Sequence, residues 1–302
     1  MRIASLLPSA TEILYALGLG DSVVGVTHEC DFPPEAAQKP VLIKPRVDPH
    51  AAPAEIDRQV FELVNRGESV YAIDADLLAS LKPDLIVTQD LCHVCAASPE
   101  DLATALLRFR DPPRILTLTP HSLSDVWLDI VRVGEATGTT AQAEMLAANL
   151  KDSVDRVDAI VASASYRPRV LCLEWLEPLY VAGHWVPEMI SKAGGRDALG
   201  RRGEPSFKVT AEKAASSNAE IILIMLCGYS AARNAAEFRA MQLPESWMNL
   251  PAMTRRRIFA LDANAYFSRP GLRLTAGVEL LAYLFHPDLF PASPSPEAYT
   301  KL

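Results

Sequence analysis

Thiols and imidazoles that could hold a metal ion recur in several short segments of the chain. The candidates for such a site are Cys30, Cys92, Cys95, Cys227, His28 and His93. Thiolate and imidazole are ligands that zinc and other late transition metals prefer, provided that three or four of them reach one point. The C-x-x-C pair stands alone, however, without the second pair that makes zinc-site spacing convincing. We therefore favour free thiols that line a binding surface, and keep a metal site as the alternative.

A second set of residues suits a flat ligand. Its aromatic members are Phe32, Trp175, Tyr180, Trp185, Tyr229, Tyr266 and Phe267. Flat faces of this kind, with a polar handle on each Trp and Tyr, suit a large planar or semi-apolar ligand whose edges carry amides. The alternative is that several of these rings pack in the hydrophobic cores.

Short aliphatic runs followed by helical patterns must position these residues. Such runs are typical of parallel sheets with helices on both faces, and they occupy residues 2–6, 23–27, 84–88, 114–118, 169–173, 219–225 and 258–261. Ligands of open parallel sheets lie beyond the carboxyl ends of the strands, where the aromatic rings and thiols follow. The same segments supply the remaining expected contacts: Pro8, Ser9, Gln89, Asp90, His184 and Arg269.

Other segments predict helices and a tail. Residues 39–68 are rich in Pro and charge, and we expect one helix there, over residues 54–66. Ser9 begins a Ser-x-x-Glu pattern with Glu12, so we expect its hydroxyl to cap a helix. Leucines recurring over 272–285 predict a final helix, and the Pro-rich residues 291–302 predict a loosely docked end.

The order of these elements occurs twice. Residues 81–87 (LKPDLIV) are answered by 217–223 (SNAEIIL), and 114–118 (RILTL) by 257–261 (RIFAL). Two copies of one arrangement predict two similar lobes with a ligand cleft between them.

A long connector joins the copies. Residues 141–163 contain no Gly or Pro, which predicts a stiff helix of roughly 35 Å. We predict an α/β fold with Rossmann-like lobes over 1–120 and 167–302, joined by a helical segment over 121–166.

Composition limits the partners and the compartment. With 29 Lys and Arg against 37 Asp and Glu, the formal charge of −8 argues against nucleic acid as a partner. No apolar run approaches the roughly 18 residues of a membrane span. The first strand follows Met1 directly, so we expect a cytoplasmic protein, or a periplasmic or membrane-associated one if a leader was removed. Five cysteines agree with reduced thiols, and we expect a monomer.

Several motifs resemble one family of binding proteins. Residues 2–21 (RIASLLPSATEILYALGLGD) and 81–87 are similar to the helical-backbone, or class III, substrate-binding proteins of ABC importers for cobalamin and iron-siderophores. Four further segments resemble the cobalamin-binding branch, in a group that lacks a leader: 88–96 (TQDLCHVCA), 174–178 (EWLEP), 183–189 (GHWVPEM) and 264–271 (NAYFSRPG).

The resemblance implies a binding protein, not an enzyme, that captures a cobalamin-like corrinoid for an ABC permease. The strand-end aromatics would contact the ring, and Arg269 would face phosphate or amide oxygens of the ligand. His28, His93 or His184 would be axial donors to cobalt, because neutral imidazole is a good ligand for such a metal. No cofactor is required, since cobalamin is the expected ligand. The alternatives are an iron-siderophore or haem binder and a thiol- or metal-dependent enzyme on the same scaffold.

Overall fold

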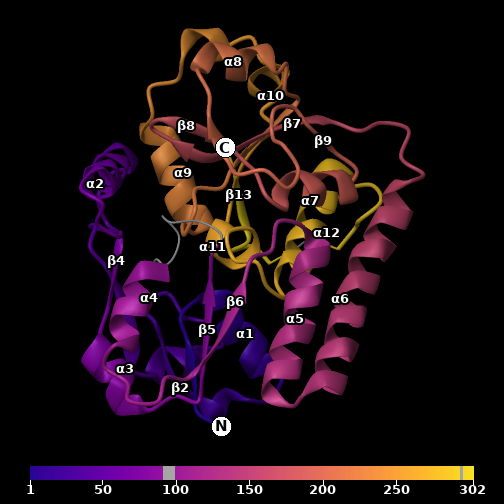
Figure 1. Ribbon diagram of the computed structural model, residues 1–302. Helices are drawn as coiled ribbons and strands as arrows, with labels where there is room; N and C mark the ends of the chain where they lie inside the picture. Colours follow the sequence, from indigo (N-terminus) through magenta and orange to yellow (C-terminus); the bar gives the residue numbers. More distant parts are fainter. Residues whose placement is uncertain (91–98, 293–294) are drawn as a thin grey trace. The chain divides into compact units, whose positions relative to one another are not determined.

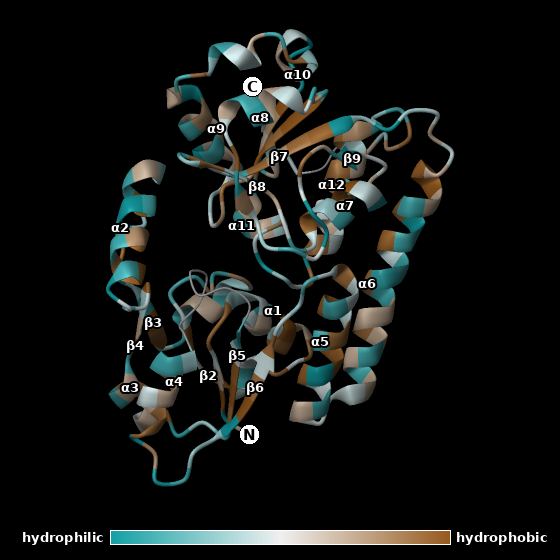
Figure 2. Ribbon diagram, turned by 45° about the horizontal axis from the view of Figure 1, so that its top comes forward, coloured by the Kyte–Doolittle hydropathy of each residue, from teal (hydrophilic) through white to brown (hydrophobic). Residues whose placement is uncertain are grey.

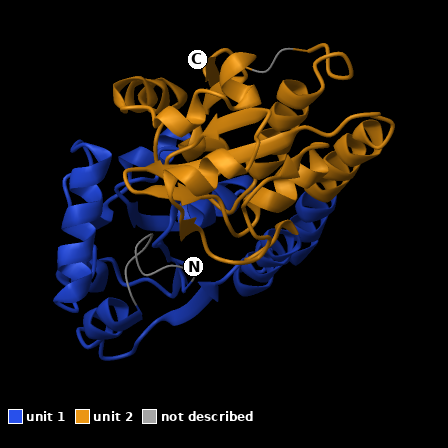
Figure 3. Ribbon diagram, turned by 90° about the horizontal axis from the view of Figure 1, so that it is seen from above, with its two compact units in different colours: residues 1–120, 124–148 blue, residues 121–123, 149–302 orange. Residues whose placement is uncertain are grey.

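The chain folds into two compact α/β units. The computed structural model describes residues 1–90, 99–292 and 295–302. The first unit comprises Met1–Pro120 and Ser124–Ala148, and the second comprises His121–Leu123 and Asn149–Leu302 (Figure 3). Each unit is built around one sheet with helices packed against it (Figure 1). The two-lobe α/β fold that the sequence repeat predicts is thereby confirmed.

The first unit holds a six-stranded sheet in the order β4-β3-β2-β1-β5-β6. The strands are β1 (Ile3–Ser5), β2 (Val23–Thr27), β3 (Val41–Pro45), β4 (Tyr71–Ile73), β5 (Leu85–Gln89) and β6 (Arg114–Leu118). All neighbours run parallel except β4, which is antiparallel to β3. Every residue of β5 is buried, as expected of a central strand that is covered on both faces.

Helices and short turns complete this unit. They are α1 (Pro8–Ala16), η1 (Gly20–Ser22), η2 (Pro34–Gln38), α2 (Pro53–Asn65), α3 (Ala75–Leu81) and α4 (Pro99–Leu106). The helix expected over residues 54–66 is confirmed as α2. Strand β3 was missed because the Pro-rich segment around it lacks the alternation or long apolar run that indicates a strand.

The second unit holds a seven-stranded sheet. Six strands follow the order β10-β8-β7-β11-β12-β13, and β9 pairs with β7. Their bounds are β7 (Arg169–Leu176), β8 (Leu179–Val181), β9 (Arg196–Asp197), β10 (Phe207–Lys208), β11 (Ile221–Ile224), β12 (Ile258–Leu261) and β13 (Tyr299–Lys301). Strands β9, β7, β11 and β12 are parallel, whereas β8, β10 and β13 join antiparallel.

The helices of the second unit include the expected final helix. They are α7 (Val186–Lys192), α8 (Ala211–Ser216), α9 (Ala231–Ala240), η3 (Glu245–Trp247), α10 (Pro251–Thr254), α11 (Ala263–Tyr266) and α12 (Leu274–Phe285). The expectation of a loosely docked tail is wrong for residues 299–301. They form β13, whose backbone pairs with β12 from Phe259 to Leu261.

Two long helices connect the sheets. Helix α5 spans Leu123–Thr137, and α6 spans Thr140–Val161, which confirms the predicted connector. Its 22 residues span about 33 Å at 1.5 Å per residue. Figure 2 shows polar and apolar residues alternating along α6, and Val154, Val157 and Val161 are buried. Lys192 of α7 donates to Asp158 of α6 at 2.7 Å, which ties the helix end to the second unit.

Among residues 1–90, 99–292 and 295–302, no helix combines the length and the apolar character that a membrane crossing requires.

Candidate ligand-binding site

Ser9 lies inside the first turn of α1 and does not cap it. The helix begins at Pro8, Leu7 occupies the N-cap position, and no side chain caps the helix there. Ser9 is only 1% exposed. The expected capping box is therefore wrong, because Pro8 at the first helical position moves the helix start one residue earlier than Ser9. Contact of Pro8 and Ser9 with a ligand stays a prediction.

Cys30 belongs to a buried polar cluster at the carboxyl ends of β1 and β2. Its sulfur lies 3.1 Å from Thr11 Oγ1 and 3.3 Å from Thr27 Oγ1, and the Thr27 N–H donates to it at 3.4 Å. The Thr11 hydroxyl donates to Ser5 Oγ at 2.8 Å. The thiol therefore joins β1, α1 and β2, which gives it a role in packing.

His28 and Phe32 flank this cluster along the chain. A hydrogen bond of 3.1 Å joins His28 Nδ1 to Ile43 O, and the His28 ring lies 5.9 Å from the Tyr71 ring. Phe32 is 43% exposed, and the other predicted aromatic contacts are more buried than it. An exposed ring that follows a parallel strand is consistent with a ligand contact.

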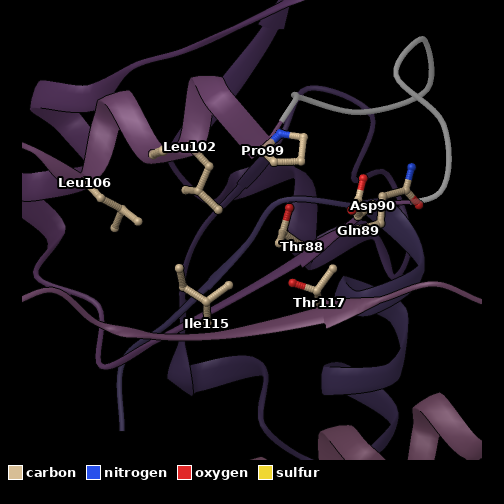
Figure 4. A pocket seen from close by; sticks show the side chains of 9 residues that line it. Thr88, Gln89, Asp90, Pro99, Leu102, Leu106, Ile115 and Thr117 are labelled. Carbon is tan, nitrogen blue, oxygen red and sulfur yellow. The ribbon is translucent and has the colours of Figure 1, made fainter.

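Gln89 and Asp90 border a small cavity at the ends of β5 and β6. The cavity is about 190 Å³, and its other lining residues include Thr88, Thr117 and four aliphatic residues of α4 and β6 (Figure 4). Ligand pockets usually measure at least about 300 Å³, so this hollow alone is too small for a macrocycle. Contact of Gln89 and Asp90 with a ligand stays a prediction.

His184 and Trp185 form one packed pair. Their rings stack with centroids 5.6 Å apart, and the indole N–H of Trp185 donates to Phe267 O at 2.8 Å. Trp185 is 5% exposed. The two residues follow β8, which runs antiparallel to β7, so the rule for parallel strand ends does not place them.

His184 has an unusual backbone conformation and a perturbed imidazole. Its φ is 52°, and its backbone makes two hydrogen bonds with the loop at Gly203 and Glu204. Burial, with the nearby His121 as a second cause, lowers the pKa of His184. At neutral pH the imidazole is therefore uncharged, the form that can donate to a metal.

Glu188 is a buried carboxylate that sequence reasoning missed. It is 5% exposed, accepts the N–H of Leu123 at 3.1 Å and is paired with Arg202. Leu123 is the first residue of α5, whose N–H has no partner within the helix. The carboxylate thus caps α5 from a distant part of the sequence. Because 65 residues separate Glu188 from Leu123, no local sequence pattern could have predicted this cap.

Trp175 and Tyr229 meet at the carboxyl ends of β7 and β11. Their rings make an edge contact with centroids 5.7 Å apart, and Tyr180 is the cross-strand partner of Trp175. Burial raises the pKa of Tyr229 to about 12, so its phenol stays neutral at physiological pH. Here the structure brings together three aromatic residues that the strand-end rule predicted.

The remaining predicted contacts have different surroundings. Phe267 and Arg269 are buried, and Phe267 supplies the carbonyl that receives Trp185. Tyr266 instead lines a second cavity of about 550 Å³ together with residues of α6, α12 and the C-terminal segment. Its role as a strand-end contact stays a prediction.

The described thiols differ in burial. Cys30 and Cys172 are buried, whereas Cys227 is exposed. Within the described part of the chain, no three His, Cys, Asp or Glu side chains are grouped as a metal site requires. Cys92, His93 and Cys95 lie outside the described residues.

The family comparison places the chain among substrate-binding proteins of the ABC transporter type. The periplasmic binding protein family matches residues 3–265, and the chain belongs to that family.

Curated relatives and solved structures agree with this class. The chain is 26% identical to an ABC transporter substrate-binding lipoprotein, YvrC, of Bacillus subtilis, over 96% of this chain and 81% of the relative. It is 22% identical to a vitamin B12-binding protein of Vibrio parahaemolyticus, over 92% and 87%.

Two solved structures share the fold. The vitamin B12-binding protein BtuF of Vibrio cholerae superposes with a TM-score of 0.69 at 22% identity, covering 95% of this chain and 96% of that one. The haem-binding protein RhuT of Roseiflexus superposes with a TM-score of 0.72 at 24% identity, covering 95% and 98%.

Proposed function

We propose that this substrate-binding protein captures a cobalamin-like corrinoid, and that an ABC permease receives it. The observation that carries the proposal is the group of aromatic rings at the carboxyl ends of β7 and β11, where Trp175 packs against Tyr229. Trp175 and Tyr180 are partly exposed there, while Tyr229 is buried and supports Trp175 from the side. Partly exposed rings offer flat apolar surface with polar edges, which suits a macrocycle rimmed by amides.

Relatives support the corrinoid over other chelates. Proteins named vitamin B12-binding in two Vibrio species match 92% of the chain at 22% and 25% identity. A protein named cobalamin-binding in Halobacterium salinarum matches 94% of the chain at 25% identity. Haem-binding proteins are its neighbours in fold, which leaves haem as the second candidate to test.

His184 is the axial donor that we propose for cobalt among the described imidazoles. Its Nδ1 is buried and has no hydrogen-bond partner among the described residues, and its lowered pKa keeps the ring neutral. His28, in contrast, already uses Nδ1 for Ile43 O.

Equilibrium titration tests the proposal. Purified protein is titrated with aquocobalamin and cyanocobalamin while the corrin bands and the tryptophan fluorescence are recorded, and haem is titrated in parallel. We expect saturable changes with both cobalamins. Imidazole coordination would shift the bands of aquocobalamin, and His184→Ala would remove that shift. Binding of haem without binding of either cobalamin would overturn the corrinoid assignment.

A further inference from the structure

Two residues on neighbouring antiparallel strands, Tyr180 and Lys208, continue the aromatic contact between Trp175 and Tyr229. Trp175 of β7 is paired with Tyr180 of β8, and Tyr180 is paired with Lys208 of β10. Directly paired residues of antiparallel strands point to the same face of a sheet. The Lys208 ammonium lies 5.4 Å from the centre of the Tyr180 ring.

A second cation lies at the other end of this series. The guanidinium carbon of Arg233 is 3.6 Å from the centre of the Tyr229 ring, and Arg233 Nη2 donates to the Tyr229 hydroxyl at 2.8 Å. Lys208, Tyr180, Trp175, Tyr229 and Arg233 therefore form one series, which we call the aromatic row.

Arg233 lies in the first turn of α9. Its N–H donates to Ser230 Oγ at 3.3 Å at the start of α9, and Glu237 one turn later lies 3.6 Å from its Nε. About 30% of the Arg233 side chain is exposed, so part of it is accessible from solution.

We infer that the aromatic row binds a flat macrocycle that carries an anionic group at its edge, with Arg233 and Lys208 as the residues that select for that anion. Rings in the centre of the row favour the apolar face of a macrocycle, and cations at its ends favour a phosphate or carboxylate. The inference rests on the proposed function and specifies it further: a corrinoid that bears the phosphate of the nucleotide loop is preferred over one that lacks it.

The test removes the phosphate from the ligand in one arm and the proposed cationic partner from the protein in the other. Cobinamide is a corrinoid without the nucleotide and its phosphate, so its affinity is compared with that of cyanocobalamin. The variants are Arg233→Met, which keeps an unbranched apolar stem, Arg233→Lys, which keeps the charge, and Lys208→Met. Arg239→Met is the matched control, because Arg239 is an exposed arginine on the same helix.

We expect Arg233→Met to weaken cyanocobalamin binding about 10- to 100-fold, the range for a hydrogen bond to a charged group. Cobinamide affinity should change by less than about threefold, because no phosphate contact is lost. Arg233→Lys should retain part of the preference, and Arg239→Met should retain all of it. Equal losses for both corrinoids in Arg233→Met and Lys208→Met would overturn the inference.

The haem and corrinoid titrations distinguish failure of this inference from failure of the proposed function. If haem binds and neither corrinoid does, the corrinoid assignment fails, and Arg233→Met then tests the same anion contact through the haem carboxylates. Unchanged haem affinity in that variant would overturn the inference too. Thermal unfolding of each variant checks the fold, and exposed Lys208 provides the test if Arg233→Met is unstable.

Discussion

Trp185 is a residue whose replacement separates packing from ligand contact. Its indole is buried, stacks on His184 and donates to Phe267 O, so Trp185→Ala removes a large ring and leaves a carbonyl without its partner. Truncation of a buried Trp costs about 3 to 5 kcal/mol. Trp185→Phe keeps an aromatic ring but loses the N–H donor and part of the indole volume, which we expect to cost about 1 to 3 kcal/mol.

Urea unfolding followed by circular dichroism measures both losses, and cobalamin titration of the same variants measures affinity. We expect the order of stability to be wild type, Trp185→Phe and Trp185→Ala, with affinity unchanged in any variant that remains folded. A Trp185→Ala variant that is as stable as the wild type but binds cobalamin more weakly would refute the packing role and make Trp185 a ligand contact.

Three further predictions follow from the described contacts. Asp197 Oδ1 accepts the backbone N–H groups of Leu199 and Gly200. Burial nevertheless raises the pKa of Asp197 from 3.8 to about 6, so the folded state binds a proton more tightly than the unfolded state does. The unfolding free energy should therefore rise by about 2 to 3 kcal/mol from this group as pH falls from 7 to 4, and Asp197→Asn should flatten that rise; an unchanged slope would contradict it. A Cβ at Gly183 would collide with the backbone at Glu204 and Ser206, so Gly183→Ala should lower the unfolding free energy by about 2 kcal/mol or more, and a neutral effect would show that the loop yields. In a C92S/C95S variant, Cys227 should react quickly with a thiol reagent while buried Cys30 and Cys172 react slowly; a second fast thiol would exclude this account.

Local sequence patterns determined the central strands and the connector. Strands β5 and β12 follow from their short aliphatic runs, and α6 follows from a segment without Gly or Pro. These signals are local, because burial of a central strand and continuity of a helix depend on neighbouring residues. The same patterns placed Tyr229 after a parallel strand, whereas Trp175, expected just beyond a strand, lies within the last residues of β7.

Only the tertiary structure decided how edge strands and side chains meet. Strands β8, β10 and β13 are two or three residues long, too short for an alternation pattern, and they form because a longer strand offers free backbone groups beside them. The contact of Glu188 with Leu123 and the contact of Trp175 with Tyr229 join residues more than fifty positions apart. Such pairs depend on the path of the chain in space, so the sequence identified the aromatic residues while the fold decided that Arg233 and Lys208 lie beside them.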